Sequence, residues 1–326
     1  MNDGFKISAY AVNSILDRID PLIREISGVL AGVDPECLHR MRVGSRRLRM
    51  ALRLQAEYAG LPDSPAFSRL IRLVTRTLGE ARDLDVQIMW LKEFLNSCTT
   101  NEKAGVSRLI LRLSQERESI QPRIALTISD ITDDPVFKKT TEALRLARLD
   151  AEMSGITTAN SDVEHATRAI NLQLDSVIQH SMSLMTPEAH EGHHRMRIEV
   201  KRLRYAMEIS MGVYGVVEKE LDGYMAVVKK LQAMLGVLHD ADVWIGRIPE
   251  MSAAELERTK KYFGAPTNFS RLSPGYDAIA RDRLRFREEQ YERALNFWNE
   301  TVDSGRWKEF RDLLLRTYRE IVGMQG

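Results

Sequence analysis

An internal repeat is the feature that most constrains how this chain can fold. Residues 39–51 read HRMRVGSRRLRMA and residues 194–206 read HRMRIEVKRLRYA, so eight positions are identical at an offset of 155. A second pair follows in the same order, with LGEARDLDVQI at 78–88 and LGVLHDADVWI at 235–245, at an offset of 157. Two matched blocks in the same order indicate a unit that is duplicated within the chain.

The pattern of apolar residues predicts that this unit is helical. Apolar side chains recur at three-and-four spacing along most of the chain, as in Leu221, Met225, Val228, Leu231 and Leu235. Alternating patterns typical of strands are not found at useful length. Breakers such as Asp34-Pro35 and Thr186-Pro187 delimit helices of roughly 15 to 30 residues, which is the usual length in helical bundles. We therefore predict an all-α protein.

The boundary between the two units is expected in a small and polar stretch, residues 154–160. We place it so that residues 1–157 form the first helical unit and residues 158–326 the second. Each unit is long enough for about four helices. Because the two units carry the same blocks in the same order, we expect them to be related by pseudo-two-fold symmetry.

The first block of each unit predicts a basic helix with its cations on one side. At 3.6 residues per turn, these side chains fall within about 80° of one another around the helix axis. In the first copy they are His39, Arg42, Arg46, Arg49 and Arg53, and in the second copy His194, Arg197, Lys201 and Arg204. Residues 39–53 hold six arginines and no acidic residue that could pair with them one turn away. Apolar residues border this stripe on both sides, so an external anion is expected to neutralise it.

The chemistry of the stripe favours a linear ligand that carries phosphate. The guanidinium group is a fixed fork of donors that stays charged and matches phosphate oxygens. Successive cations rise along the helix by about 4.5 to 6 Å, so they form a line and not a single pocket. A linear polyanion fits this line better than a mononucleotide does.

Further charged residues lie around the stripe. Asp83 and Asp240 stand at equivalent places in the second block, and we interpret them as partners that orient arginines of the neighbouring helix. Arg72 and Arg76 share a helical face with Asp83. Four arginines of the first block project away from the stripe, and we treat them as flanking: Arg40, Arg47, Arg195 and Arg202.

Composition narrows the class of protein. The 47 Lys and Arg residues are balanced by 46 Asp and Glu, so the chain as a whole is not polycationic and the local clustering of charge is what carries information. Cys37 and Cys98 are too few for a disulfide framework or a thiolate zinc site. Neither a secretory signal nor a membrane span is recognisable, so we expect a soluble cytoplasmic protein without membrane contact.

Other functions stay open. A cationic groove would also follow a nucleic-acid backbone, although the stripe lacks the aromatic residues that would stack bases, so we do not expect nucleic acid as the main partner. His190, Glu191 and His194 match the zincin pattern H-E-x-x-H, in which two histidines bind zinc and the glutamate activates water. Gly192 is unfavourable inside that helix and no third ligand is evident. A metal-dependent phosphohydrolase is a separate alternative, which would need metal-holding carboxylates or a nucleophile near the stripe. We therefore expect no enzyme, no catalytic residue, no metal and no cofactor.

The two blocks together resemble the CHAD family, the conserved histidine α-helical domain. The matching segments are H-x-x-R-x-x-x-R-R-L-R from His39 to Arg49, H-x-x-R-x-x-x-K-R-L-R-Y from His194 to Tyr205, and the two LG-x-x-x-D-x-D-V segments. The resemblance covers essentially the whole chain. It implies two four-helix bundles around a basic central channel or cleft that binds inorganic polyphosphate, and in some members recruitment to polyphosphate granules.

The resemblance also implies which residues face the ligand. They are the stripe residues of both copies other than Arg53, with contributions from the following helix of each unit at Arg72, Arg76 and Lys229. Arg82 and its counterpart His239 join the flanking basic residues. The implied partner is inorganic polyphosphate, and a protein partner is not predicted.

Overall fold

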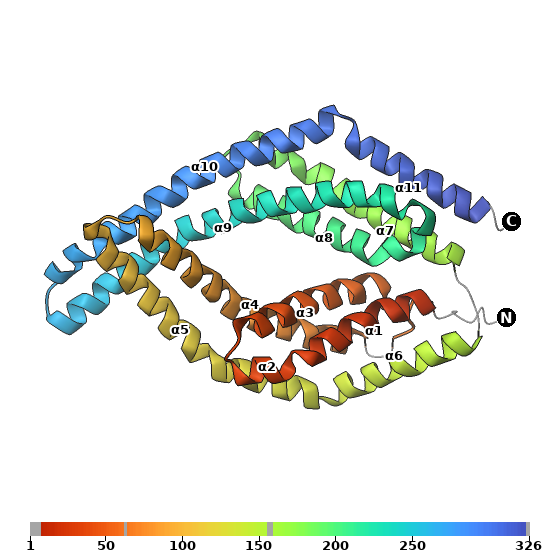
Figure 1. The fold of residues 1–326 in the computed structure, drawn as a ribbon, viewed down its shortest axis with the longest axis horizontal. Coiled ribbons are helices and arrows are strands. Elements are labelled where there is room, and N and C mark those ends of the chain that lie inside the picture. The colour runs from red at the N-terminus through yellow and green to blue at the C-terminus, as the bar shows by residue number, and fades with distance from the viewer. Residues whose placement is uncertain (1–7, 62–63, 155–158, 324–326) are drawn as a thin grey trace.

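A computed structural model describes residues 8–61, 64–154 and 159–323, and these fold into helices with no strand among them (Figure 1). The prediction of an all-α protein is confirmed. In the first half the helices are α1 (Ala9–Arg24), α2 (Ile26–Ala31), α3 (Pro35–Gln55), α4 (Ser64–Phe94), α5 (Thr100–Asp133) and α6 (Pro135–Ser154). In the second half they are α7 (Ala159–His180), α8 (His190–Tyr214), α9 (Glu218–Phe263), α10 (Ser273–Asp303) and α11 (Arg306–Gly323). The predicted boundary between residues 157 and 158 lies outside the described residues.

Local sequence signals explain where several helices begin. The side chain of Asp34 accepts a hydrogen bond from the backbone N–H of Glu36 at 2.9 Å, and Pro35 follows at the first helical position of α3. Both residues favour a helix start. The Asp34 side chain satisfies a backbone N–H that has no partner within the helix, and Pro35 has no backbone N–H that would need one. Thr99 and Glu102 form a capping box at the start of α5. The basic helix α3 is therefore fixed at its N-terminus by its own sequence.

The buried apolar side chains form three clusters. One draws mainly on α1 to α6, includes Ile15, Leu48 and Phe67, and also takes in Ile209 of α8. A second lies within the segment from α7 to α11 and includes Leu203 and Phe310. The third cluster joins the halves, because it draws its residues from α4, α5, α9 and α10, together with Cys98 from the turn before α5. The residues of the four helices are Leu84, Ile88, Leu91, Val106, Leu109, Leu113, Trp244, Ile248, Tyr276 and Ile279. Figure 1 shows these four helices meeting at one end of the molecule. The pseudo-two-fold relation between two four-helix bundles stays a prediction.

Two glycines allow α5 and α10 to meet closely in this third cluster. A Cβ atom on Gly105 would lie 2.0 Å from the carbonyl oxygen of Leu272, and one on Gly275 would lie 2.5 Å from the carbonyl oxygen of Glu102. Both contacts are far shorter than a carbon atom tolerates against backbone. The absence of side chains at these positions therefore places Tyr276, the next residue of α10, against α5.

In the described part of the chain, no helix is both long enough and apolar enough to cross a bilayer.

Candidate polyanion-binding channel

The basic helices α3 and α8 lie against each other between the two halves of the molecule. Arg46 of α3 donates from Nε to the hydroxyl of Tyr205 on α8 at 3.2 Å. Tyr205 is 3% exposed, so its hydroxyl is a fixed acceptor for the guanidinium. The two copies of the repeated block are thus brought together in space, although 155 residues separate them in sequence.

A pocket lies beside this contact, and every charged residue that lines it is an arginine or a lysine. Its volume is about 410 Å³, and its wall is formed by α3, α4 and α8. The charged residues that line it are Arg46, Arg49, Arg53, Arg72, Lys201 and Arg202. We call it the arginine pocket. Since no described carboxylate lines it, the cations must repel one another or be neutralised from outside.

Most of these cations have no partner in the described part of the protein. Arg202 forms an ion pair with Glu199 at 2.5 Å, and Arg46 uses Tyr205 as an acceptor. Across residues 8–61, 64–154 and 159–323, no hydrogen bond or ion pair reaches the side chains of Arg49, Arg53, Arg72 or Lys201. Arg49, Arg53 and Arg72 are exposed to solvent, whereas Lys201 is half-buried among them. The repulsion between these like charges disfavours the free protein, and an anionic ligand would relieve it.

A second pocket continues from the first and contains both signs of charge. It has a volume of about 400 Å³. Its charged and titratable lining residues are His39, Arg42, Arg46, Arg82, Asp83, Arg197, His239, Asp240 and Arg247. We call it the aspartate pocket. Arg46 lines both pockets, so they adjoin at that residue, and we refer to the two together as the candidate channel along α3 and α8.

The two aspartates stand beside arginines of the stripe. Arg42 donates from Nη2 to Asp83 at 3.3 Å, and Asp240 acts electrostatically on Arg197. Nε of Arg42 and Nε of Arg197 are buried without an acceptor in the described structure, as is Nδ1 of His39. Unpaired buried donors are rare in folded proteins, and they cluster here in the wall of the aspartate pocket.

The accumulated charge changes the protonation of the channel. Burial, followed by the positive charges of Arg46 and Arg197, lowers the pKa of Lys201 to about 7. Burial also lowers the pKa of His39 and of His194, and the neighbouring arginines add to the effect. Near neutral pH, Lys201 therefore stands at its titration midpoint, and the two histidines of the stripe favour their neutral forms.

Several residues predicted for the site lie outside both pockets. Arg204 donates to Glu208 at 2.8 Å and to Gln232 at 3.3 Å, so its charge is paired within the protein. Arg76 and Lys229 are exposed and line neither pocket. His194 lies against His239, with 3.1 Å between their Nδ1 atoms, and only His239 lines the channel.

The flanking arginines differ from one another. Arg40 pairs with Glu25 at 2.8 Å, Arg47 lies 3.7 Å from Glu208, and Arg195 pairs with Glu191 at 3.2 Å. Arg202 and Arg82, by contrast, contribute to the wall of the channel. Thus two of the residues that we expected only to flank the site belong to its lining.

Sequence reasoning missed Tyr205 as an acceptor and Arg247 as a lining residue. Arg247 donates from Nη1 to Gln87 at 3.2 Å and reaches the aspartate pocket from α9. It lies seven residues after Asp240, on the same face of that helix. The seven-residue spacing from Asp240 could have identified Arg247, although it lies just beyond the repeated block that ends at residue 245.

The two histidines of the H-E-x-x-H pattern contact different partners. Nδ1 of His190 lies 2.6 Å from Asp242, which also accepts from Arg287 at 2.7 Å. His194 faces His239 instead. Within the described ranges, no group of three or more His, Cys, Asp or Glu side chains could hold a metal ion together.

The structure is an all-helical domain with two adjoining pockets lined by basic residues of the repeated helices, and comparison with known proteins identifies its family. The CHAD domain model matches residues 14–249, so the chain belongs to the CHAD domain family. The crystal structure of the CHAD domain from the plant Ricinus communis is similar, with 25% identity and a TM-score of 0.60, over 86% of this chain and 91% of that one.

A second solved structure, PptA from Streptomyces chartreusis, shares the fold. It has 16% identity and a TM-score of 0.56, with 90% of this chain and all of that chain covered (100%). No curated protein matches the chain significantly.

Proposed function

We propose that this protein binds inorganic polyphosphate in the channel between α3 and α8, without catalysing a reaction on it. The observation that supports the proposal most strongly is the arginine pocket, where cations gather with no described carboxylate among the lining residues. Membership of the CHAD family supports the same ligand. Association with polyphosphate granules follows as part of the proposal.

The channel suits a chain of phosphates more than a single one. From His39 to Arg53 the stripe of α3 rises by about 21 Å, so several consecutive phosphates can be engaged. Each guanidinium offers charge-assisted hydrogen bonds, which are roughly twice as strong as those between neutral groups. Binding energy therefore accumulates along the polymer, and affinity should increase with its length.

The described aromatic residues of the channel are poorly placed to stack bases. Tyr205 is 3% exposed and holds Arg46, while Trp244 is 6% exposed and packs in the cluster that joins the halves. Proteins that bind single-stranded nucleic acid generally offer open aromatic faces. This favours a polymer without bases.

Charge reversal in the channel tests the proposal. The double variant Arg46→Glu with Lys201→Glu places one negative charge where both pockets meet and another in the arginine pocket. We expect loss of detectable polyphosphate binding with unchanged helical content. Arg285→Glu with Lys308→Glu is the matched control, because it changes the net charge equally at exposed positions outside the channel. Equal binding by both double variants would contradict the site assignment.

A further inference from the structure

A third pocket lies where α5 of the first half meets α9 and α10 of the second. Its volume is about 520 Å³, and it is separate from the arginine pocket. Arg112, Arg247, Arg258 and Tyr276 supply hydrogen-bond donors to its wall. Arg247 also lines the aspartate pocket, so this third pocket adjoins the channel at that residue.

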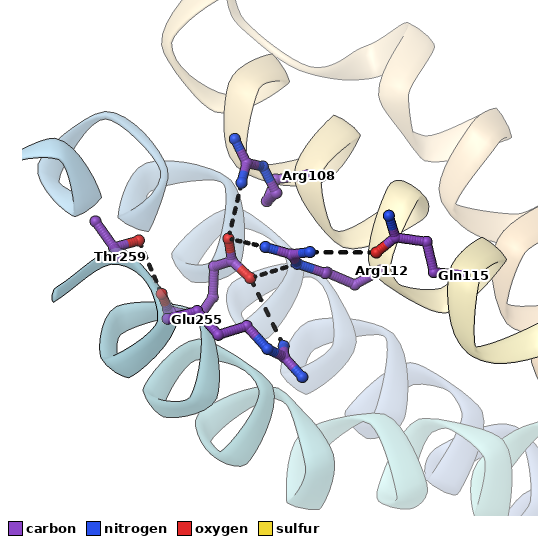
Figure 2. Close-up of polar contacts among 6 residues, drawn as sticks. Arg108, Arg112, Gln115, Glu255 and Thr259 are labelled. Atoms are coloured by element: carbon purple, nitrogen blue, oxygen red, sulfur yellow. Dashed lines mark hydrogen bonds and ion pairs between the residues drawn. The ribbon is translucent and has the colours of Figure 1, made fainter. Parts of the chain in front are cut away.

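One buried carboxylate organises the arginines here, as Figure 2 shows. Glu255 is 1% exposed and accepts from Arg112 Nε at 2.8 Å and from Arg108 Nη1 at 3.1 Å. Arg258 approaches the same carboxylate at 3.7 Å. Burial alone would raise the pKa of Glu255, but the hydrogen bond and charge of Arg112 and the charges of the other arginines hold it below its usual range.

The arginines around Glu255 carry more positive charge than this one carboxylate can neutralise. A single ionised carboxylate faces three guanidinium groups, so two positive charges of the cluster are not neutralised by it. The guanidinium of Arg112 is fixed further by donating to Gln115 at 3.2 Å. Arg112 is therefore held in place before any ligand arrives, which reduces the entropy lost on binding.

Tyr276 is an independent indication of a ligand. Its side chain is 2% exposed and lines this pocket, and its hydroxyl has no hydrogen-bond partner in the described structure. Burial raises the pKa of Tyr276 to about 12, so the hydroxyl is a neutral donor at physiological pH. A buried hydroxyl without a partner is costly, and an anionic oxygen in the pocket would satisfy it.

The wall of the pocket limits the size of the ligand. Glu116 and Glu250 line it as exposed residues, and apolar side chains such as Leu113 and Met251 cover another part. Carboxylates at the rim repel a long polyanion but are compatible with a compact anion held deeper, beside the arginines. The arginine pocket, in contrast, has no described carboxylate in its lining.

We propose that this pocket binds a compact phosphate-class anion, such as inorganic phosphate or diphosphate, between the arginines at Glu255 and the hydroxyl of Tyr276. The site adjoins the aspartate pocket at Arg247, but its ligand contacts are its own and the proposal does not depend on the function proposed for the channel. Its ligand contacts α5 and α9 together, so occupancy would reinforce the junction between the two halves of the molecule.

Calorimetric titration with inorganic phosphate and with diphosphate, at constant ionic strength, tests this proposal. The protein is the full chain carrying Arg46→Glu and Lys201→Glu, so that the channel does not contribute. We expect saturable binding of one anion per chain. Adding Tyr276→Phe should weaken it roughly tenfold, since a hydrogen bond to a charged group is lost.

The tyrosine variant separates ligand binding from folding. Because the Tyr276 hydroxyl has no partner, Tyr276→Phe should not lower the thermal midpoint of the free protein. Tyr291→Phe is the matched control: its hydroxyl donates to the carbonyl of Leu184 at 2.8 Å, so this change should lower the midpoint and leave anion binding unchanged.

Three results would overturn the proposal. One is the absence of saturable binding of either anion to the channel variant. Another is equal affinity with and without Tyr276→Phe. The third is competition by long polyphosphate at this pocket as strong as that of diphosphate. None of them affects the polyphosphate proposal, which is tested on the protein with an intact channel.

Discussion

Nε of Arg46 lies 3.2 Å from the hydroxyl of Tyr205, and this contact joins the two copies of the repeated helix at the middle of the channel. Arg46 is also the residue that the arginine pocket and the aspartate pocket share. The hydrogen bond to Tyr205 fixes the guanidinium of Arg46, while the other donors of that group stay free to bind the proposed ligand. The Arg46–Tyr205 pair is therefore the structural centre of the site.

Tyr205→Phe should weaken polyphosphate binding while leaving the fold intact. The change removes the acceptor that fixes Arg46 and keeps the buried ring. We expect a loss of roughly threefold to tenfold in affinity, the size of one ordinary hydrogen bond, because Tyr205 acts on the ligand only through Arg46. Titration with long-chain polyphosphate measures the loss, and circular dichroism checks the fold. An unchanged affinity would show that Arg46 does not need this contact.

Polyphosphate binding should tighten as pH falls from about 8.5 to 6. Lys201 has a pKa of about 7 in the free protein, and a polyanion beside it favours the charged form, so binding takes up a proton in this range. Affinities at several pH values, with long chains to minimise the titration of terminal phosphates, measure the effect. Lys201→Arg should flatten the profile, since arginine stays charged throughout. A flat profile for the unaltered protein would contradict the assignment of Lys201.

In the free protein, the effect of Lys201 on stability should have the opposite dependence on pH: stability rises as pH rises, whereas binding tightens as pH falls. Its pKa in the folded state is depressed below the unfolded value, so between about pH 7 and 10 the unfolded chain binds more protons. The contribution of Lys201 to the free energy of unfolding then becomes more favourable as pH rises through this window. Denaturant titrations of the unaltered protein and of Lys201→Met, compared at pH 6.5 and 9, would reveal the difference. No pH dependence in the comparison would mean that Lys201 is not destabilised by its neighbours.

Neutralising a carboxylate in the channel should strengthen binding. Asp240 lines the aspartate pocket, and no hydrogen bond holds it to an arginine in the described structure, so it opposes the polyanion. Asp240→Asn is expected to raise affinity roughly threefold to tenfold at low salt, with a smaller gain at high salt. Asp222→Asn at an exposed position serves as the control. Weaker binding by Asp240→Asn would indicate that this carboxylate orients Arg197 instead.

The junction of the two halves should be sensitive to a single methyl group. Gly105→Ala places a carbon 2.0 Å from the carbonyl oxygen of Leu272, and relieving that clash should cost about 1–3 kcal/mol of stability. Gly223→Ala in α9 meets nothing within 4 Å, so it should instead stabilise the helix by up to about 1 kcal/mol. Chemical denaturation distinguishes the two. Equal stabilities would show that α5 and α10 do not need to be this close.

The sequence was informative where the signals are local. The start of α3 at Pro35 follows from the Asp34 cap, and the angular stripe of cations follows from helical geometry. The ion pair that keeps Arg204 from serving the site could also have been predicted, because Glu208 lies one turn further along the same helix.

What the sequence could not show depends on contacts between distant segments. The cluster that joins α4 and α5 to α9 and α10 has no local signature, because its residues have the same spacing as any buried helical face. The pairing of Arg46 with Tyr205 spans 159 residues. For the same reason, the donors around Glu255 were not recognised: Arg108 and Arg112 lie on a helix outside both repeated blocks.

The most direct test of the central claim is a competition titration of the purified protein at two salt concentrations. Long-chain polyphosphate, short-chain polyphosphate, single-stranded RNA and duplex DNA are compared at equal phosphate concentration. If the channel binds a linear phosphate polymer, long polyphosphate binds most tightly, short chains bind more weakly, and affinity falls as salt rises because counterions are released. Equal or tighter binding of RNA or DNA, or no binding of polyphosphate, would contradict the claim.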